Sequence, residues 1–395
     1  MAIQRATLTV GPAAGADIIG ADSRALQAAV DYVAGLGGGV VRILPGTYTM
    51  YDSLQLRSGV AVIGSGTETV LRKADAIVSP LYLDGDYGEE EITLVDASGF
   101  APGMGVTILD QRAAGFHVTV ARIKAKDGNV LQIDWPLQAD YLVSAGALAQ
   151  TTFPVISGYF LQGARVENLT IDGNKAANPE LTGCRGAGIF LYRAKGCAIR
   201  NCLVRDFNGD GISFQQSDDI TIEGCQCLGN TQLGIHPGSG SQRPVVRGCR
   251  MEGNGRIGLF LCWRVKHGLF EDNEIIGNGQ VGISIGHKDT DNVFRRCLVQ
   301  GNGRYGIHFR EELEPMSGHR NSFEDCTVEA NGTAQEGAGL CIEGHTRGTL
   351  LRRCLIRGHK WGIAVGPNAE RPMLEEVRFE ANSAGDVISL SEAAR

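Results

Sequence analysis

A glycine followed by an apolar residue recurs at a nearly fixed interval through the second half of this 395-residue chain. The pairs begin at Gly188, Gly211, Gly234, Gly258, Gly282, Gly306, Gly339 and Gly362, with a looser copy at Gly385. The interval is 23 or 24 residues, with one exception of 33. Two further positions keep the same step: cysteine at 202, 225, 249, 297, 326 and 354, and asparagine at 208, 230, 254, 278, 302 and 331. Like residues in a fixed register indicate one supersecondary unit stacked on copies of itself.

Each unit has room for three short strands and three turns, and for no helix of ten residues with apolar periodicity. Val, Ile, Cys and Gly dominate the unit, whereas a leucine-rich horseshoe, the competing repeat of similar length, needs several Leu per unit. The repeat therefore predicts an all-β fold, a single-stranded parallel β-helix in which one unit makes one coil. Cysteine at an inward position then reads as reduced core packing rather than a disulfide framework.

The rest of the chain divides into three predicted regions. Residues 1–85 carry a short amphipathic helix after Asp22, which caps the open end of the solenoid, and the first coils. Residues 86–150 break the repeat and predict a small β insertion, and residues 151–395 form the main coils. Residues 1–16 show no signal peptide, and no stretch approaches the 18 apolar residues of a membrane span.

The alternation of side chains along the strand after each glycine places one set of polar residues outside the core. The outward positions are Tyr192, Ser213, Gln215, His236, Ser284, His308, Arg310 and Glu343, and the following turns add Trp263, Arg264, His267, His287, Lys288, Glu311 and His345. Five of the eight histidines fall on this face (His236, His267, His287, His308, His345). A row of cations, imidazoles and one Trp suits an anionic sugar chain, and the net charge of −7 argues against nucleic acid. A solvated polar face without a ligand is the alternative.

Lys288 and Arg310 lie 22 residues apart, on adjacent coils of the predicted solenoid. Eliminating a 4-linked uronic acid requires a neutralised carboxylate, a base for the C5 proton and an acid for the leaving oxygen. Lys288 is the predicted base and Arg310 the predicted acid, with His287 and His308 beside them. Trp263, Arg264, His267, His236, Gln215, Tyr192, Glu311, Glu343 and His345 are the predicted substrate-binding residues. Ion pairing of Lys288 and Arg310 with Asp289 or Glu311 is the structural alternative.

The stretch from Gly282 to Asn292, followed by Gly306-Ile-His-Phe-Arg310, resembles the chondroitinase B and alginate lyase family of right-handed β-helix polysaccharide lyases. In that resemblance Lys288, Asn292 and Arg310 match the family's Lys base, Asn and Arg acid, while Asp289 and Glu311 replace its Ser and His. The resemblance implies a secreted or periplasmic lyase acting on a uronate polymer, alginate first. It also implies calcium held by an acidic cluster one or two coils earlier. Trp263, Arg264 and His267 stand there instead, so we expect no cofactor.

Three alternatives to a lyase stay open. A uronate C5-epimerase shares the proton abstraction. Asn208-Gly-Asp-Gly-Ile-Ser213 resembles the polygalacturonase strand that carries a catalytic Asp, here Asp210, but a paired Asp one coil later is missing, so we interpret Asp210 as a turn residue. A tailspike-like adhesin would hold a glycan without cutting it. The oligomeric state is left open.

Overall fold

The computed structural model describes residues 6–333 and 336–390, which form two compact units. Unit 1 comprises residues 1–158, 167–190 and 206–209, and unit 2 comprises residues 159–166, 191–205 and 210–395. The strands β13 (Ile156–Tyr159), β14 (Arg165–Asp172) and β15 (Ala187–Tyr192) have residues in both units. No helix among the described residues has the length and apolarity that crossing a membrane requires.

Unit 1 begins with the predicted helix, α1 (Ser23–Gly35), which is confirmed. The Asp22 carboxylate caps it by accepting hydrogen bonds from the backbone N–H groups of Arg24 and Ala25. Its buried face lies against parallel strands of the first coils, since it contacts β1 and β3. These strands are β1 (Ala6–Gly11), β2 (Ile18–Ile19), β3 (Gly39–Ile43), β4 (Gly46–Met50), β5 (Leu54–Gln55) and β6 (Val60–Lys73).

The predicted β insertion is an antiparallel sheet of six strands with a core of its own, which includes Val106, Ile108 and Tyr141. The strands are β7 (Val78–Pro80), β8 (Glu91–Thr93), β9 (Gly105–Leu109), β10 (Thr119–Asp127), β11 (Val130–Ile133) and β12 (Leu148–Gln150).

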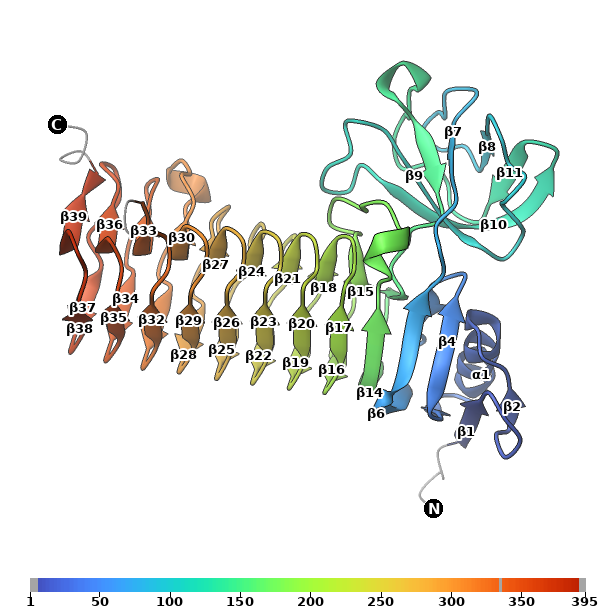
Figure 1. Cartoon of the computed structure of the whole chain (residues 1–395), viewed down its shortest axis with the longest axis horizontal. Coiled ribbons are helices and arrows are strands. Elements are labelled where there is room, and N and C mark those ends of the chain that lie inside the picture. The colour runs from blue at the N-terminus through green and yellow to red at the C-terminus, as the bar shows by residue number, and fades with distance from the viewer. Residues whose placement is uncertain (1–5, 334–335, 391–395) are drawn as a thin grey trace. The chain divides into compact units, whose positions relative to one another are not determined.

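Unit 2 consists of stacked coils of three strands each, as the repeat predicts (Figure 1). Each strand pairs in parallel with its counterpart one coil away, for example Ile222 with Val246 and Ile283 with Ile307. The first sheet contains β16 (Ala198–Arg200), β19 (Thr221–Glu223), β22 (Val245–Arg247), β25 (Leu269–Glu271), β28 (Val293–Arg295), β31 (Ser322–Glu324), β34 (Leu350–Arg352) and β37 (Met373–Glu375). The second contains β17 (Leu203–Arg205), β20 (Gln226–Leu228), β23 (Arg250–Glu252), β26 (Glu274–Ile276), β29 (Leu298–Gln300), β32 (Thr327–Glu329), β35 (Leu355–Arg357) and β38 (Arg378–Glu380). The third contains β18 (Asp210–Gln215), β21 (Leu233–Gly238), β24 (Ile257–Phe260), β27 (Val281–Ile285), β30 (Tyr305–Phe309), β33 (Ala338–Ile342), β36 (Trp361–Val365) and β39 (Gly385–Ser389).

The repeated asparagines form a buried ladder along the coils of unit 2. Asn254 Nδ2 donates to Asn278 Oδ1 at 2.9 Å, and Asn278 Nδ2 donates in turn to Asn302 Oδ1 at 2.9 Å. The same Oδ1 atoms accept backbone N–H groups of the previous coil, as between Asn254 N and Asn278 at 3.1 Å. The ladder therefore satisfies turn backbone groups that no strand can pair. The repeated cysteines are buried free thiols, as expected from their spacing.

His359 replaces asparagine in this ladder and predicts an acid-sensitive fold. Its Nε2 accepts from Asn331 Nδ2 at 3.2 Å, and its Nδ1–H donates to Asn382 Oδ1 at 3.3 Å, which requires a neutral ring. Burial lowers the pKa of His359 to about 4, although the Asn382 hydrogen bond opposes this shift.

Unfolded chains bind a proton on histidine near pH 6.5, above the pKa of about 4 in the folded protein. The unfolded state therefore holds more protons in this window, and the free energy of unfolding should fall by up to about 1.4 kcal/mol per pH unit of acidification. Urea unfolding at pH 7 and pH 5 measures the slope. The variant His359→Asn, which restores the ladder residue, should show a shallower slope; an equal slope in both proteins would contradict the assignment.

Candidate functional site

The outer face of the third sheet in unit 2 carries the predicted site row. Register pairs Ser213 with His236, Ser284 with His308, and His308 with Cys341. A second row lies two residues further along each strand, where Gln215 pairs with Gly238 and Gly238 bridges to Cys262. The core side of the same strands holds the apolar residue after each glycine, such as Ile235 and Ile283, which are fully buried.

Asp210 and His236 form a buried hydrogen-bonded pair at one end of these rows. His236 Nδ1 lies 2.7 Å from Asp210 Oδ2, and both side chains are 5% exposed. Burial lowers the pKa of His236, but hydrogen bonding to Asp210 and an interaction with the Cys262 thiol raise it by more, to about 10. The interpretation of Asp210 as a turn residue is wrong, because it begins strand β18 and binds His236.

Trp263 and His287 stack on one another in the turns that follow β24 and β27. Their ring centroids are 4.6 Å apart with an interplanar angle of 25°, and Trp263 is 43% exposed. His287 Nε2 lies 2.6 Å from Glu312 Oε1. Burial and the Arg310 cation lower the pKa of His287, while Glu312 opposes them. The ring therefore favours the neutral state, in which Nε2–H donates to Glu312.

Lys288 and Arg264 present exposed cations on either side of this stack. The backbone forms a tight turn in both coils, because Trp263 and Arg264 have φ values of 64° and 63°, and His287 and Lys288 have 47° and 69°. Two adjacent non-glycine residues in the left-handed region are costly, and such strain concentrates at functional sites. The Lys288 ammonium makes no hydrogen bond or ion pair within the described part of the chain, and its backbone N–H donates to Met316 in the 3-10 helix Glu314–Met316.

Arg310 lies beside Lys288 in sequence register, but its guanidinium is held from below. Nη1 donates to Ser284 Oγ at 2.8 Å, and Nη2 donates to the Leu261 carbonyl at 2.8 Å and to Asp289 Oδ2 at 3.3 Å. Burial raises the pKa of Asp289 to about 7, although Arg310 opposes this shift. The geometry gives Arg310 the place of a buried ion-pair partner to Asp289, the structural alternative considered for it.

His308 and Glu343 form a third histidine–carboxylate pair, 2.7 Å apart between Nε2 and Oε2. The hydrogen bond from His308 lowers the pKa of Glu343. The Cys341 thiol lies close by, and one donor atom from each of His308, Cys341 and Glu343 falls within 4.8 Å of the others. Imidazole, thiolate and carboxylate are ligands that suit zinc, so this cluster is the place on the row that a metal would occupy.

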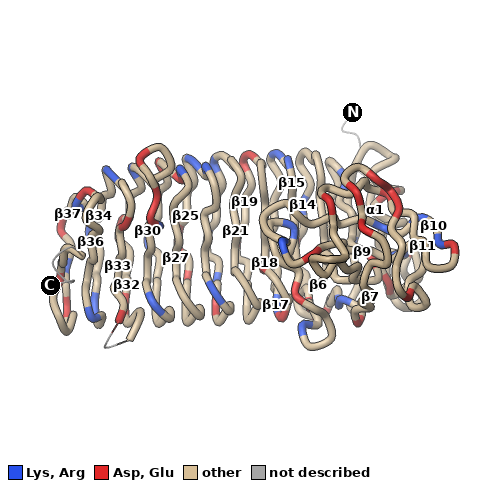
Figure 2. Tube along the Cα trace, turned by 90° about the horizontal axis from the view of Figure 1, so that it is seen from above, with Lys and Arg blue, Asp and Glu red and all other residues tan. Residues whose placement is uncertain are grey.

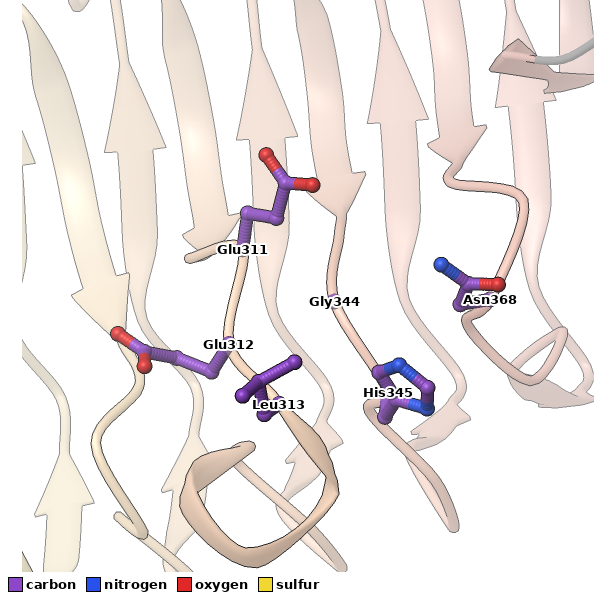
Figure 3. Close-up of a pocket in the computed structure, with 6 residues that line it drawn as sticks. All are labelled: Glu311, Glu312, Leu313, Gly344, His345 and Asn368. Carbon is purple, nitrogen blue, oxygen red and sulfur yellow. The ribbon is translucent and has the colours of Figure 1, made fainter.

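The remaining predicted binding residues lie away from the Trp263–His287 stack. Glu311 and His345 line a hollow of about 320 Å³ with Glu312, Leu313, Gly344 and Asn368 (Figure 3). Tyr192 packs edge-on against Phe160, with ring centroids 5.9 Å apart, at another shallow hollow. His267 is exposed in the next turn after Arg264, where its charge lowers the pKa of Asp291 as a cause weaker than the Arg320 hydrogen bond.

Comparison with known proteins establishes what the stacked coils are. Residues 160–312 match a family model described as a right-handed β-helix region. The protein is a right-handed parallel β-helix. No curated protein sequence matches the chain significantly.

Three solved β-helix structures illustrate the likeness. The A-module of mannuronan C-5 epimerase AlgE4 from Azotobacter vinelandii superposes with a TM-score of 0.59 and 16% identity, over 93% of each chain. An exopolygalacturonase from Thermotoga maritima gives 0.58 and 12% over 93% of this chain and 87% of its own. ORF18 of Geobacillus virus E2 gives 0.55 and 14% over 92% and 58%. At these identities the likeness shows the fold alone.

Charged side chains of the β-helix mix both signs along the edges of its coils, and the strands between them are mostly uncharged (Figure 2). Sequence reasoning brought Gln215, His236, His287, His308 and Glu343 to one face, and the structure agrees. It missed Cys262 and Phe260, which belong to the same rows. Their signal is the register itself, since Cys262 falls 24 residues after Gly238 in the second row.

Proposed function

We propose that this β-helix is a polysaccharide lyase that cleaves a uronate-containing polysaccharide, alginate being the first candidate, on the outer face of its third sheet. The observation that carries the proposal is the exposed Trp263 stacked on His287, whose Nε2 binds Glu312, between the exposed cations of Arg264 and Lys288. A polymer of this kind goes with an extracellular or periplasmic location.

Each part of this arrangement suits one requirement of β-elimination. The exposed indole offers an apolar platform for a sugar ring. Lys288 and Arg264 would neutralise the uronate carboxylate, which stabilises the charge that develops when C5 loses its proton. Lysine becomes a base when burial disfavours its ammonium. Since Lys288 is exposed, carboxylate binding suits it better than the role of base that the sequence predicts.

His287 is the proposed base. With Nε2–H donated to Glu312, its Nδ1 carries the lone pair, and this atom has no hydrogen-bond partner among the described residues. Nδ1 is buried in the free protein, so sugar binding must move Trp263 or the imidazole to open it. The C5 proton passes to Nδ1, the C4–O bond breaks, a C4–C5 double bond forms, and the leaving oxygen takes a proton from water.

The hydrolase alternative needs a pair of free carboxylates. On this face Asp210, Glu312 and Glu343 each bind a histidine, which disfavours it. An epimerase shares the first step but forms no double bond, and an adhesin performs neither.

Incubation with alginate, pectate, hyaluronan and chondroitin, followed by ultraviolet absorbance and reducing-end assays, tests the proposal. A lyase yields absorbing unsaturated ends on at least one polymer. Reducing ends without absorbance would establish hydrolysis, an inverted uronate without chain cleavage would establish epimerisation, and binding without any product would establish an adhesin. Each of these three outcomes overturns the lyase.

Lys288→Ala is expected to raise KM for the polymer more than it lowers kcat, because it removes a cation that binds the carboxylate in the ground state and the transition state alike. We expect a rise of about tenfold, which corresponds to one charge-assisted contact. Lys360→Ala in a distant turn is the matched control and should leave KM unchanged. A loss of kcat at unchanged KM would instead return Lys288 to the role of base.

A further inference from the structure

Cys262 lies directly after β24 and differs from the other ten cysteines, which are all buried. Its backbone N–H donates to the Pro237 carbonyl at 3.0 Å, and its own carbonyl accepts from Ser239 N. These bonds fix Cys262 beside Gly238, at the point where the left-handed turn of Trp263 and Arg264 begins. A nucleophile at a sharp turn after a strand stands clear of the sheet.

Two glycines leave room on both sides of Cys262 in the second row. A Cβ at Gly238 would lie 2.4 Å from Gln215 Oε1 and 2.8 Å from the Cys262 carbonyl, so the Gln215 side chain fills that space. A Cβ at Gly286 would lie 2.8 Å from Arg310 Nε. The side chains of Gln215 and Arg310 therefore lean over the two glycines, toward the coil of Cys262 from opposite sides.

His236 connects Cys262 to Asp210. Asp210 occupies Nδ1 of the ring, so the interaction with the Cys262 thiol falls to Nε2. No hydrogen bond of normal geometry joins Nε2 to any described residue. The steps from Asp210 to His236 and from His236 to Cys262 are each 26 residues, one coil plus two positions, which produces a diagonal across three coils.

Three buried polar atoms around this thiol have no hydrogen-bond partner among the described residues: Gln215 Oε1, His236 Nε2 and Arg310 Nε. Gln215 and His236 are 0% and 4% exposed. Buried polar atoms in folded proteins are almost always hydrogen-bonded, so their convergence marks a place where another polar group belongs.

We propose that Cys262, His236 and Asp210 are the nucleophile, base and orienting acid of an acyl-transfer site, whose substrate class is a carboxylic ester. The arrangement follows the logic of a thiol activated by an imidazole whose other nitrogen is held by a carboxylate. The adjacent Trp263 makes an ester borne by a sugar the natural form of the substrate, and this detail alone rests on the proposed function.

The reaction balances without a further reagent. The thiol proton moves to His236 Nε2, and Sγ bonds to the ester carbonyl carbon while the N–H of Arg310 Nε is available to the developing oxyanion. The ester C–O bond breaks, the alcohol leaves with the proton from His236, and a thioester remains on Cys262. Water, deprotonated by His236, then cleaves the thioester and releases a carboxylic acid and the thiol.

The test uses the full chain with p-nitrophenyl acetate and, separately, iodoacetamide. We expect a burst of nitrophenol of about one equivalent, an acetyl group located by mass spectrometry on Cys262, and turnover lowered by about 10²-fold or more in Cys262→Ala. Iodoacetamide should label Cys262 in the native protein at least about 10-fold faster than in His236→Gln, because the base is lost. Circular dichroism and the thermal midpoint check that each variant is folded.

Ester cleavage by Cys262→Ala at the wild-type rate would overturn the proposal, as would acetylation at another residue. Because His236 is buried, His236→Gln can fail to fold. In that case the pH dependence of wild-type alkylation decides, and a rate that follows an ordinary free thiol contradicts an imidazole-activated one. The acetate ester carries no uronate, so its result does not depend on whether the protein cleaves polysaccharides.

Discussion

His287→Gln is expected to lower kcat of polymer cleavage by about 10²–10⁴-fold, the range that a positioned general base contributes. Glutamine keeps the polar contact with Glu312 and retains a stacking surface for Trp263, so substrate binding should change little. The measurement is the initial rate of ultraviolet absorbance on the best polymer of the panel. His319→Gln, in the loop that follows β30, is the matched control and should keep full activity.

The pH profile separates the base from its neighbours. Because the pKa of His287 is lowered, the acidic limb of kcat/KM should lie below pH 6.5, the ordinary value for histidine. Glu312 opposes this shift, so Glu312→Gln should move the limb to still lower pH. A limb that stays in place in Glu312→Gln, or a His287→Gln variant with full activity, would remove His287 from the mechanism.

Arg310→Met is expected to reduce the free energy of unfolding by about 3–5 kcal/mol, the cost of leaving a buried charge without its partner. Asp289 is fully buried and keeps only backbone donors, Val265 N and Gly286 N, once the guanidinium is gone. Chemical unfolding followed by circular dichroism measures the loss. Arg353→Met, which removes an exposed partner of Asp325, is the matched control and should cost at most about 1 kcal/mol.

The loss should also depend on pH. Burial raises the pKa of Asp289 to about 7, above its unfolded value, so the folded state binds more protons between these values and its stability falls as the pH rises. Arg310 counteracts this rise in pKa, so the variant should lose more stability at pH 8 than at pH 5. The double variant with Asp289→Asn should recover part of the loss. An Arg310→Met protein as stable as the wild type but inactive would instead favour the acid role predicted from the sequence.

The repeat predicted the fold because a fixed interval constrains every coil at once. The helix, the insertion and the outward face followed from local periodicity, which depends only on neighbouring residues. The roles within the face did not follow, because they depend on lateral offsets between coils. Arg310 is two positions beyond His308 and reaches over Gly286 to Leu261, a contact that only the absence of a side chain at Gly286 permits.

The pairing of Asp210 with His236 escaped sequence reasoning for a similar reason. A Gly-Asp-Gly sequence is typical of a turn, yet here the strand begins at Asp210 and directs its carboxylate to the next coil. Lys288 was correctly placed beside Arg310 in register, but nothing in the sequence distinguishes an exposed ammonium from a buried one.

The Asn ladder has a consequence for how this protein can change in length. Each rung accepts and donates the same bonds, so duplication of one winding beyond Glu343 would extend the spiral while leaving the reactive groups untouched. An extra winding inserted between Cys262 and Arg310 would instead separate their coils by another strand spacing of about 4.8 Å, and the guanidinium would no longer reach Leu261. The number of repeats is therefore free to drift in one part of the molecule and is fixed in the other.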